Sequence, residues 1–486
     1  MIHTGDDHRR RSGFRCTAAA LAGAFAVLSG CAVGPDYRKP EVQAPAAYKE
    51  NVDWKVAQPQ ETVVRGAWWK VFKDPQLDAL EEQVDISNQT VAAAEAQYRL
   101  ALAVVRAGRA GYFPTVTAGA QATRSLRSAN ASSVAVVTSD ASDYLLTGTA
   151  SWEPDIWGKV RRTVESNQAG AQASAADLES IRLSTQALLA QNYFQLSALD
   201  AQKKLLDETA AAYEKSLQLT RNRYANGVAS RAEVLQAETQ LKSTQAQAID
   251  LGVQRAQLEH AIAVLIGKPA SLFSIPVTPL TASPPAIPVG IPSELLERRP
   301  DIAAAERRVA SANAQIGVAE AAYYPSIMLG ATGGFESSDI TNWLSWPSRL
   351  WSVGLSLSQT LFDAGLRSAQ TDQARASYDT TVASYRQTVL TGFQEVEDNL
   401  AALRILEEES RVQGEAVNAA RKSVEVSRNQ YKAGTISYLD VVVVQAILLA
   451  NERVAVDISG RRMVAGVLLI KAIGGGWDVS APPSGN

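Results

Sequence analysis

Apolar residues recur at helical spacing along two very long stretches of the chain that contain no proline. Residues 159–224 and 366–431 are dominated by Ala, Gln, Leu, Glu and Lys, which are good helix formers. In the second stretch the apolar positions alternate steps of four and three, at Val389, Phe393, Val396, Leu400 and Leu403. A further helix from about Tyr438 places apolar residues seven apart, at Val442, Leu449, Val456, Met463 and Ile470. These seams predict long helices that supercoil against neighbouring helices.

Four shorter segments show the alternation of a β-strand instead. In residues 351–359 the side chains of Val353, Leu355 and Leu357 face one way, and serine and glycine face the other. The same pattern is less regular in residues 113–123, 144–152 and 326–335. Each segment has about the 9–11 residues that a tilted strand needs to cross a bilayer. The alternative is a small antiparallel sheet in a soluble domain.

The chain is internally duplicated. The pattern RNxYxxGxxS occurs at residues 221–230 and again at residues 428–437, an offset of 207 residues. Gly227 and Gly434 in the two copies predict helix ends with left-handed caps. Each repeat is therefore expected to close with an antiparallel helical hairpin. The predicted hairpin tips are residues 226–230 and 433–437.

This duplication divides the chain into segments. The first repeat covers residues 74–266 and opens with an aspartate N-cap and a helix expected over residues 75–108. The second repeat covers residues 300–473. A proline-rich stretch at residues 267–299 is expected to link the repeats at the equator of the molecule, and residues 474–486 form a C-terminal tail.

The number of strands predicts the assembly. Two strands in each repeat give four per chain, and a membrane barrel needs about eight or more, because an open sheet edge in lipid leaves backbone groups unpaired. Three chains supply twelve strands, and the same symmetry arranges the long helices as a tube. The predicted fold is mostly α-helical with a small membrane β part. It is a homotrimer in which a twelve-stranded β-barrel stands on an α-helical barrel.

The N-terminus predicts the compartment. Four arginines between positions 9 and 15 precede a short apolar run that ends in the sequence LSGC, whose last residue is Cys31. This arrangement resembles a bacterial lipoprotein signal, so we expect residues 1–30 to be removed and Cys31 to carry a covalent lipid. Ala32 favours the outer over the inner membrane, and residues 31–73 are expected to form an irregular lipid-anchored segment. The alternative is an ordinary signal peptide with a chance cysteine.

The composition argues against several classes of function. The chain carries 47 basic and 50 acidic residues, a balance that gives no sign of nucleic-acid binding. After residue 30 the only histidine is His260 and the only cysteine is Cys31, which argues against zinc chemistry and histidine-based catalysis. We therefore expect a protein that is not an enzyme, with no catalytic residues, no metal and no cofactor other than the lipid on Cys31.

Several motifs resemble those of the outer-membrane efflux factor family, in particular its lipoprotein members. They are GPDY at residues 34–37, RPDI at residues 299–302, YP at residues 324–325, FDAG at residues 362–365 and GGGW at residues 474–477. The resemblance implies a trimeric channel that spans the outer membrane of a Gram-negative bacterium and extends into the periplasm. It also implies two protein partners, a periplasmic adaptor and an inner-membrane pump of the resistance-nodulation-division type.

The resemblance further implies a gate at the periplasmic tip. Asp440 matches an acidic residue that forms a ring around the channel axis. Tyr431 matches a tyrosine that holds the tip closed by bonding an acidic residue, which Glu233 matches here. Gly227 and Gly434 mark the tips where an adaptor would dock. The alternative for Asp440 is an ordinary residue near a helix N-terminus, and for Tyr431 it is packing within the hairpin.

We therefore expect the outer-membrane channel of a tripartite efflux system, which passively conducts drugs and other small toxic molecules delivered by the pump. Two alternatives stay open. One is the same kind of channel serving a type I protein secretion system. The other is a lipid-anchored periplasmic coiled-coil protein without a pore.

Overall fold

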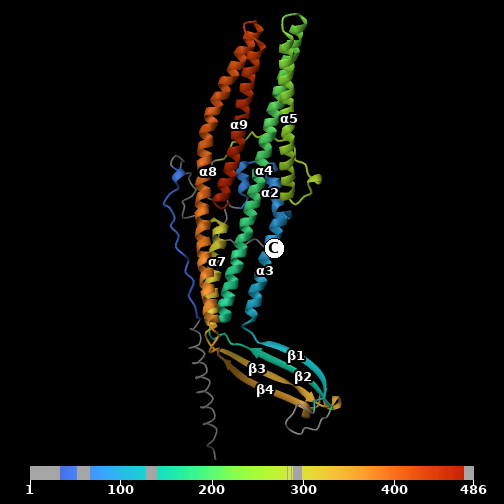
Figure 1. The fold of residues 1–486 in the computed structure, drawn as a ribbon, viewed down its shortest axis with the longest axis vertical. Helices are drawn as coiled ribbons and strands as arrows, with labels where there is room; N and C mark the ends of the chain where they lie inside the picture. The colour runs from blue at the N-terminus through green and yellow to red at the C-terminus, as the bar shows by residue number, and fades with distance from the viewer. Residues whose placement is uncertain are drawn as a thin grey trace, which may run out of the picture. The chain divides into compact units, whose positions relative to one another are not determined.

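The described part of the chain contains seven α-helices, four β-strands and several short 3-10 helices. The computed structural model describes residues 33–51, 66–126, 128, 140–281, 283–285, 287 and 298–475. Residues 1–30, Cys31 and most of the tail at residues 474–486 lie outside this description. The elements are shown in Figure 1 and are, in chain order, α2 (Pro75–Ser87), α3 (Gln89–Ala110), β1 (Thr115–Leu126), β2 (Asp140–Trp152), α4 (Lys159–Ala225), α5 (Arg231–Leu265), α7 (Pro300–Ala321), β3 (Ser326–Ser337), β4 (Arg349–Ser358), α8 (Leu366–Lys432) and α9 (Tyr438–Ala472).

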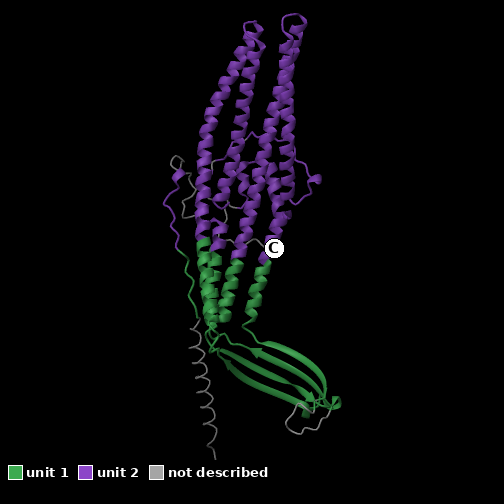
Figure 2. Cartoon of the chain, in the orientation of Figure 1, with its two compact units in different colours: residues 1–40, 99–172, 306–384 green, residues 41–98, 173–305, 385–486 purple. Residues whose placement is uncertain are grey.

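The chain forms two compact units, and each combines segments from both repeats (Figure 2). The first unit carries the four strands and consists of residues 1–40, 99–172 and 306–384. The second unit carries the two helical hairpins and consists of residues 41–98, 173–305 and 385–486. The boundary between the compact units therefore does not coincide with the boundary between the repeats.

The four strands form one antiparallel sheet in the order β1-β2-β3-β4. The central pair, β2 and β3, joins the two repeats, with Gly148 opposite Gly333. Next to this pair, Gly334 approaches β2 so closely that a Cβ would lie 1.9 Å from the carbonyl oxygen of Leu146. The glycines thus let two strands from different repeats pair across the middle of the sheet.

The strands of the first repeat run further outward than the sequence pattern predicts. β1 continues to Leu126 and β2 begins at Asp140, whereas the pattern predicts limits at residues 123 and 144. The extension has a local cause, because Leu126 lies opposite Asp140 in the ladder and Arg124 forms an ion pair with Asp140. Residue polarity alone marks this segment as a loop, but the cross-strand pairing makes it part of the sheet.

Both long helices predicted from the sequence are present. α4 and α8 each have 67 residues. The predicted seam of α8 is confirmed, since Val389, Val396 and Leu400 are completely buried and Phe393 and Leu403 are less than a tenth exposed. α4 leads into α5 and α8 into α9, which gives the two helical hairpins (Figure 1). None of the helices in the described residues combines the length and the apolar character that a membrane span requires.

One predicted helix is in fact two helices. The sequence predicts a single helix over residues 75–108, but Asn88 separates α2 from α3 in an extended conformation. The Asn88 side chain accepts hydrogen bonds from the backbone amides of Thr90 (2.8 Å) and Val91 (3.0 Å). Its amide group donates to the carbonyl oxygen of Leu265 (2.7 Å). The break therefore arises from an asparagine cap that is held by a contact distant in sequence.

One buried arginine fixes the N-terminal segment to the first unit. Arg162 of α4 donates to the carbonyl oxygens of Val33 (3.2 Å) and Gly34 (3.0 Å) and to the carboxylate of Asp36 (3.1 Å). Gly34 has φ 99°, and a Cβ on it would lie 2.4 Å from the Cα of Gly317 in α7. The GPDY motif is therefore a docking sequence in which the glycine permits close contact and the arginine satisfies the backbone.

A buried carboxylate without a partner lies on α2. Glu81 is completely buried, and neither of its carboxylate oxygens has a hydrogen-bond donor among the described residues. Asp85 and Asp78 lie one turn away on the same helix. Burial, and to a smaller extent the negative charges of Asp85 and Asp78, raises the pKa of Glu81 well above its usual value. The folded chain therefore favours the protonated form of Glu81.

Replacing Glu81 with glutamine is expected to stabilise the protein near neutral pH. Because the pKa of Glu81 is raised on folding, the unfolded chain loses this proton at a lower pH than the folded chain, and the free energy of unfolding falls as pH rises above about 4.5. Glutamine is neutral at every pH and removes this pH-dependent penalty, which grows by about 1.4 kcal/mol for each pH unit between the pKa of the unfolded chain and that of the folded chain. The midpoint of thermal unfolding of Glu81→Gln should exceed that of the unaltered protein at pH 7. The difference should disappear near pH 4.

The exposed neighbour Glu82 provides the control. Glu82→Gln removes the same charge from the same helix without relieving a buried carboxylate. An equal increase in stability for Glu82→Gln would show that net charge, and not the burial of Glu81, sets the effect.

Candidate functional site

The two helical hairpins end in turns that each contain a left-handed glycine. Gly227, between α4 and α5, has φ 71°, and Gly434, between α8 and α9, has φ 77°. In each turn the residue after the glycine donates a backbone hydrogen bond to the carbonyl oxygen five residues earlier, at 2.8 Å and 3.0 Å. Glycine suits this position because a Cβ strains the left-handed backbone. Both predicted tip glycines therefore define the chain reversal.

Each turn is followed by a capping box that fixes an acidic residue. Glu233 accepts a hydrogen bond from the backbone amide of Ser230 (3.1 Å) at the start of α5. Asp440 accepts bonds from the backbone amide (2.9 Å) and hydroxyl (2.7 Å) of Ser437 at the start of α9. Both carboxylates also lie at the positive end of a helix dipole. The geometry thus gives Glu233 and Asp440 a structural role in the turns.

The two hairpins are linked through Tyr431. Its hydroxyl donates to Oε2 of Glu233 at 3.3 Å, while Oε1 of Glu233 serves the capping box. Tyr431 is 6% exposed, whereas Tyr224, its counterpart in the first repeat, is 47% exposed. Glu233 is also one methylene longer than Asp440, its counterpart in the second repeat. The structure therefore brings a tyrosine of the second repeat into contact with an acidic residue of the first. The equivalent tyrosine of the first repeat, Tyr224, is not buried in this way.

A small apolar core surrounds this contact. Tyr431 and Tyr438 pack with their ring centroids 5.5 Å apart, and Leu217, Leu241 and Val441 belong to the same cluster. Burial raises the pKa of the Tyr431 and Tyr438 phenols. Tyr431 therefore stays protonated near neutral pH and is available as a hydrogen-bond donor to Glu233.

Asp440 lies on an exposed face of α9. Leu439, Val443 and Ile447 are each about half exposed and follow one another at intervals of one helical turn beside it. This face therefore presents one carboxylate followed by apolar side chains.

Sequence reasoning misses one residue of this site, Arg223 near the end of α4. Its guanidinium carbon lies 4.5 Å from the centroid of the Tyr431 ring, and Nη1 donates to the carbonyl oxygen of Tyr431 at 3.3 Å. A comparison of the two repeats could have pointed to this residue, because the two copies differ at its position. At the offset of 207 residues, Arg223 corresponds to the uncharged Gln430.

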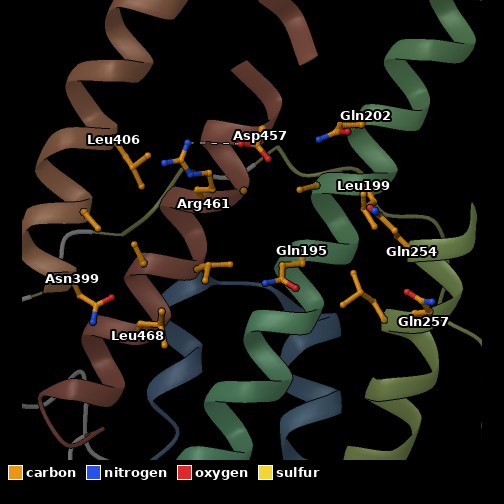
Figure 3. Close-up of a pocket in the computed structure, with 16 residues that line it drawn as sticks. Gln195, Leu199, Gln202, Gln254, Gln257, Asn399, Leu406, Asp457, Arg461 and Leu468 are labelled. Carbon is orange, nitrogen blue, oxygen red and sulfur yellow. Dashed lines mark ion pairs between the residues drawn. The ribbon is translucent and has the colours of Figure 1, made fainter. Parts of the chain in front are cut away.

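A groove lined by both apolar and polar side chains lies further along the hairpins (Figure 3). It has a volume of about 760 Å³ and is lined by residues of α4, α5, α8 and α9. Its one ion pair joins Asp457 and Arg461 at 3.8 Å. The remaining polar lining consists of neutral amides, Gln195, Gln202, Gln254, Gln257 and Asn399. These amides can hydrogen-bond to water and polar molecules, and the other uncharged lining residues are apolar.

The predicted lipidation residue, Cys31, lies outside the described residues. Close to it in sequence, the amide of Val33 donates to the carbonyl oxygen of Trp157 at 3.2 Å. Trp157 in turn donates through its indole to the carbonyl oxygen of Pro325 (2.7 Å), directly before β3, and stacks on Tyr324. The N-terminal segment is therefore held beside the start of a strand.

Solved structures with the same fold define the class of protein. The outer-membrane channel OprN superimposes with a TM-score of 0.84 at 30% sequence identity, and the match covers 92% of this chain and 100% of OprN. The CmeC outer membrane channel of Campylobacter jejuni has a TM-score of 0.86 at 24% identity and covers 93% of this chain and 96% of CmeC, which shows a shared fold. Two long helical hairpins joined to a four-stranded sheet are thus the fold of an outer-membrane channel protein.

The sequence identifies the family. The model of the family described as outer membrane efflux protein matches residues 80–268 and 291–475, and the chain belongs to this family. The probable efflux pump outer membrane protein TtgC of Pseudomonas putida is 31% identical over 463 residues, which are 94% of this chain and 95% of TtgC. The pyoverdine export outer membrane protein OpmQ of Pseudomonas aeruginosa is 31% identical over 419 residues, 85% of this chain and 87% of OpmQ. The protein is an efflux channel component of the outer membrane.

Replacing Gly434 with alanine is expected to destabilise the α8–α9 turn by about 1 kcal/mol. No neighbouring atom lies within 4 Å of the Cβ position, so the cost comes from the left-handed backbone and not from a clash. Gly414, inside α8, also has open space around it. Alanine there is expected to stabilise the helix by roughly 0.5–1 kcal/mol. Thermal unfolding should shift in opposite directions for the two variants, and shifts of the same sign would contradict the left-handed cap at Gly434.

Proposed function

We propose that this protein is a homotrimeric channel that spans the outer membrane and passively conducts small molecules to the outside as part of a tripartite efflux system. The main support for a trimer is that the sheet of a single chain is open at both edges. Its outer strands, β1 and β4, each pair with only one strand of the described chain. Family membership supplies the class of function, and the open sheet supports the proposed number of copies.

The exposed side chains of the sheet support insertion into a membrane. Val353, Leu355 and Leu357 alternate along β4 and are 63–75% exposed. An edge strand leaves a row of backbone groups unpaired, and each unpaired group costs several kcal/mol in lipid. Three copies pair their edges and give twelve strands, enough for a closed barrel with these apolar side chains facing lipid.

The helices also carry apolar faces that lack a neighbour in a single copy. On α8, Ile405, Val412 and Val426 are each about half exposed and fall at heptad positions. On α5, Leu235 and Ile249 are exposed at the same kind of spacing. A heptad stripe on a free helix face favours another helix against it. In the proposed trimer, helices of adjacent copies cover these stripes and form an α-helical barrel that extends into the periplasm.

The proposed partners are a periplasmic adaptor and an inner-membrane pump of the resistance-nodulation-division type. Related proteins of Pseudomonas putida are named as outer membrane proteins of antibiotic and toluene efflux pumps, which favours small-molecule efflux over protein secretion. The exposed tips at Gly227 and Gly434 are the proposed docking sites for the adaptor. The pump supplies the energy, and this chain performs no catalysis and binds no nucleic acid in the proposal.

The proposed membrane attachment includes a covalent lipid on Cys31 and no other cofactor. The hydrogen bonds from Arg162 to the carbonyl oxygens of Val33 and Gly34 support this assignment. Together with the bond from the Val33 amide to Trp157, they hold the residues after Cys31 beside the start of β3. A lipid attached there would enter the membrane next to the proposed barrel.

The hairpin tips form the proposed gate. Three copies of Asp440 around a narrow axis repel one another and attract cations. Three copies of Val443, one turn further along α9, form an apolar ring next to them in the proposed gate. The bond from Tyr431 to Glu233 holds the second hairpin against the first and keeps the tip narrow. Opening then requires this bond to break.

Mass measurement in mild detergent tests the assembly. We expect a trimer that forms ion-conducting channels in planar lipid bilayers.

Val353→Arg should abolish insertion, because a cation on the lipid face of a strand costs roughly 2–4 kcal/mol per copy. Ser352→Arg is the matched control, since its side chain points to the opposite face and should leave insertion intact. Conduction by single or paired copies would contradict the proposal.

Asp440→Asn is expected to weaken block of the channel by divalent cations. Asparagine keeps an oxygen that can accept the capping bond from Ser437 and removes only the charge. The half-blocking concentration of Mg²⁺ in bilayer recordings should rise about tenfold, because three carboxylates are lost from one ring. Asp457→Asn, on the same helix but roughly 25 Å away, is the control. Unchanged block in Asp440→Asn would exclude Asp440 from the gate.

A further inference from the structure

We propose that Arg223 is a positioning residue of the gate, which holds Tyr431 in place from the first repeat. The inference rests on the proposed gating function of the hairpin tips. It adds a third side chain to the contact between Tyr431 and Glu233.

Arg223 contacts Tyr431 in two independent ways. The guanidinium carbon lies 4.5 Å from the ring centroid, within the range of a cation–π interaction. Nη1 donates to the backbone carbonyl oxygen of Tyr431 at 3.3 Å. Nε of Arg223 is buried without an acceptor atom in the described part of the chain, a position in which the negative face of the ring offsets the lost hydration. One side chain thus holds both the ring and the backbone of Tyr431.

Tyr431 is therefore held from both sides of the first turn. Arg223 lies on α4 four residues before Gly227, and Glu233 lies in the first turn of α5. The phenol of Tyr431 donates to Glu233 at 3.3 Å. Arg223 and Glu233 belong to the first hairpin, and Tyr431 belongs to the second. The hairpins can separate at this point only when Tyr431 leaves both residues.

The duplication supplies an internal comparison. Arg223 and Tyr224 of the first repeat correspond to Gln430 and Tyr431 of the second. The backbone carbonyls of Arg223 and Gln430 accept the same hydrogen bond within their turns, so the turn itself does not require arginine. The side chains differ in what they contact, since the arginine covers the buried tyrosine of the other hairpin. The difference between the repeats therefore belongs to the contact between hairpins.

The geometry also explains why the residue is an arginine. A planar guanidinium can lie against an aromatic ring and still donate a directed hydrogen bond from one nitrogen. The ammonium of lysine is a compact point charge and cannot make both contacts in the same way. Arg223→Lys is accordingly expected to resemble Arg223→Gln more than the unaltered protein.

The decisive variant is Arg223→Gln, which installs the residue of the second repeat. We expect it to raise the open-to-closed ratio of single channels in planar lipid bilayers about fivefold. Arg221→Gln is the matched control. It removes the same charge two residues earlier, where the arginine is half exposed and its partner is Glu238 on α5 at 3.7 Å. The control should leave the ratio unchanged at the same ionic strength.

A double-mutant cycle separates positioning from general destabilisation. Tyr431→Leu removes the ring that Arg223 holds and should raise the open-to-closed ratio by itself. In this background, Arg223→Gln should produce a clearly smaller increase than in the unaltered protein, because the ring is gone and only the hydrogen bond from Nη1 to the backbone carbonyl of residue 431 can still be lost. A fully additive effect of the two substitutions would overturn the positioning role of Arg223.

The remaining outcomes distinguish this inference from the proposed function. An increase for Tyr431→Leu without one for Arg223→Gln would exclude Arg223 and leave the gate in place. No change for Tyr431→Leu would overturn the gate and this inference with it. Absence of conduction by the unaltered protein would overturn the proposed channel.

Discussion

The unpaired edges of β1 and β4 are the constraint on which the rest of the architecture depends. The pairing of β2 with β3 joins the two repeats into one sheet, and this leaves one open strand from each repeat at the outside. Open strand edges are tolerated in water and very costly in lipid. In the proposed trimer, adjacent copies remove the cost. In the proposed assembly the same step places the exposed heptad stripes of α5 and α8 against neighbouring helices, so the proposal couples membrane insertion to formation of the helical tube.

The duplication builds a scaffold whose two halves use the same devices. Both turns have a left-handed glycine, and both following helices begin with a serine and an acid in a capping box. If the two halves were identical, each hairpin would offer the same tyrosine and the same acid, and neither would be favoured as the donor of the hydrogen bond. The contact that the structure shows arises where the halves differ, at Glu233 compared with Asp440 and at Arg223 compared with Gln430. The shared residues thus shape the hairpins, and the differing residues decide how they meet.

Much of the fold is predictable from the sequence, because its signals are periodic and local. The heptad positions of α8 depend only on which face of the helix is buried, and the alternation of β4 depends only on which side of the sheet each residue faces. The break at Asn88 is not predictable in this way, since it requires the contact with Leu265. The partners Tyr431 and Glu233 were accessible through a family resemblance, whereas Arg223 requires the three-dimensional contact. The residues after Cys31 likewise gain their fixed structure from Arg162, which lies far away in the sequence.

Glu233 shows how the turn and the contact between hairpins depend on each other. One oxygen of its carboxylate is occupied by Ser230 in the capping box, which limits the orientation of the side chain and directs the other oxygen to Tyr431. A flexible carboxylate loses more entropy when it orders for such a bond, so the capping box lowers the entropic cost of the bond to Tyr431. Asp440 uses a single oxygen for both bonds to Ser437 and lies exposed on α9. The shorter acid is thus left with a free oxygen facing solvent, which suits a residue proposed to act on ions and not on a neighbouring hairpin.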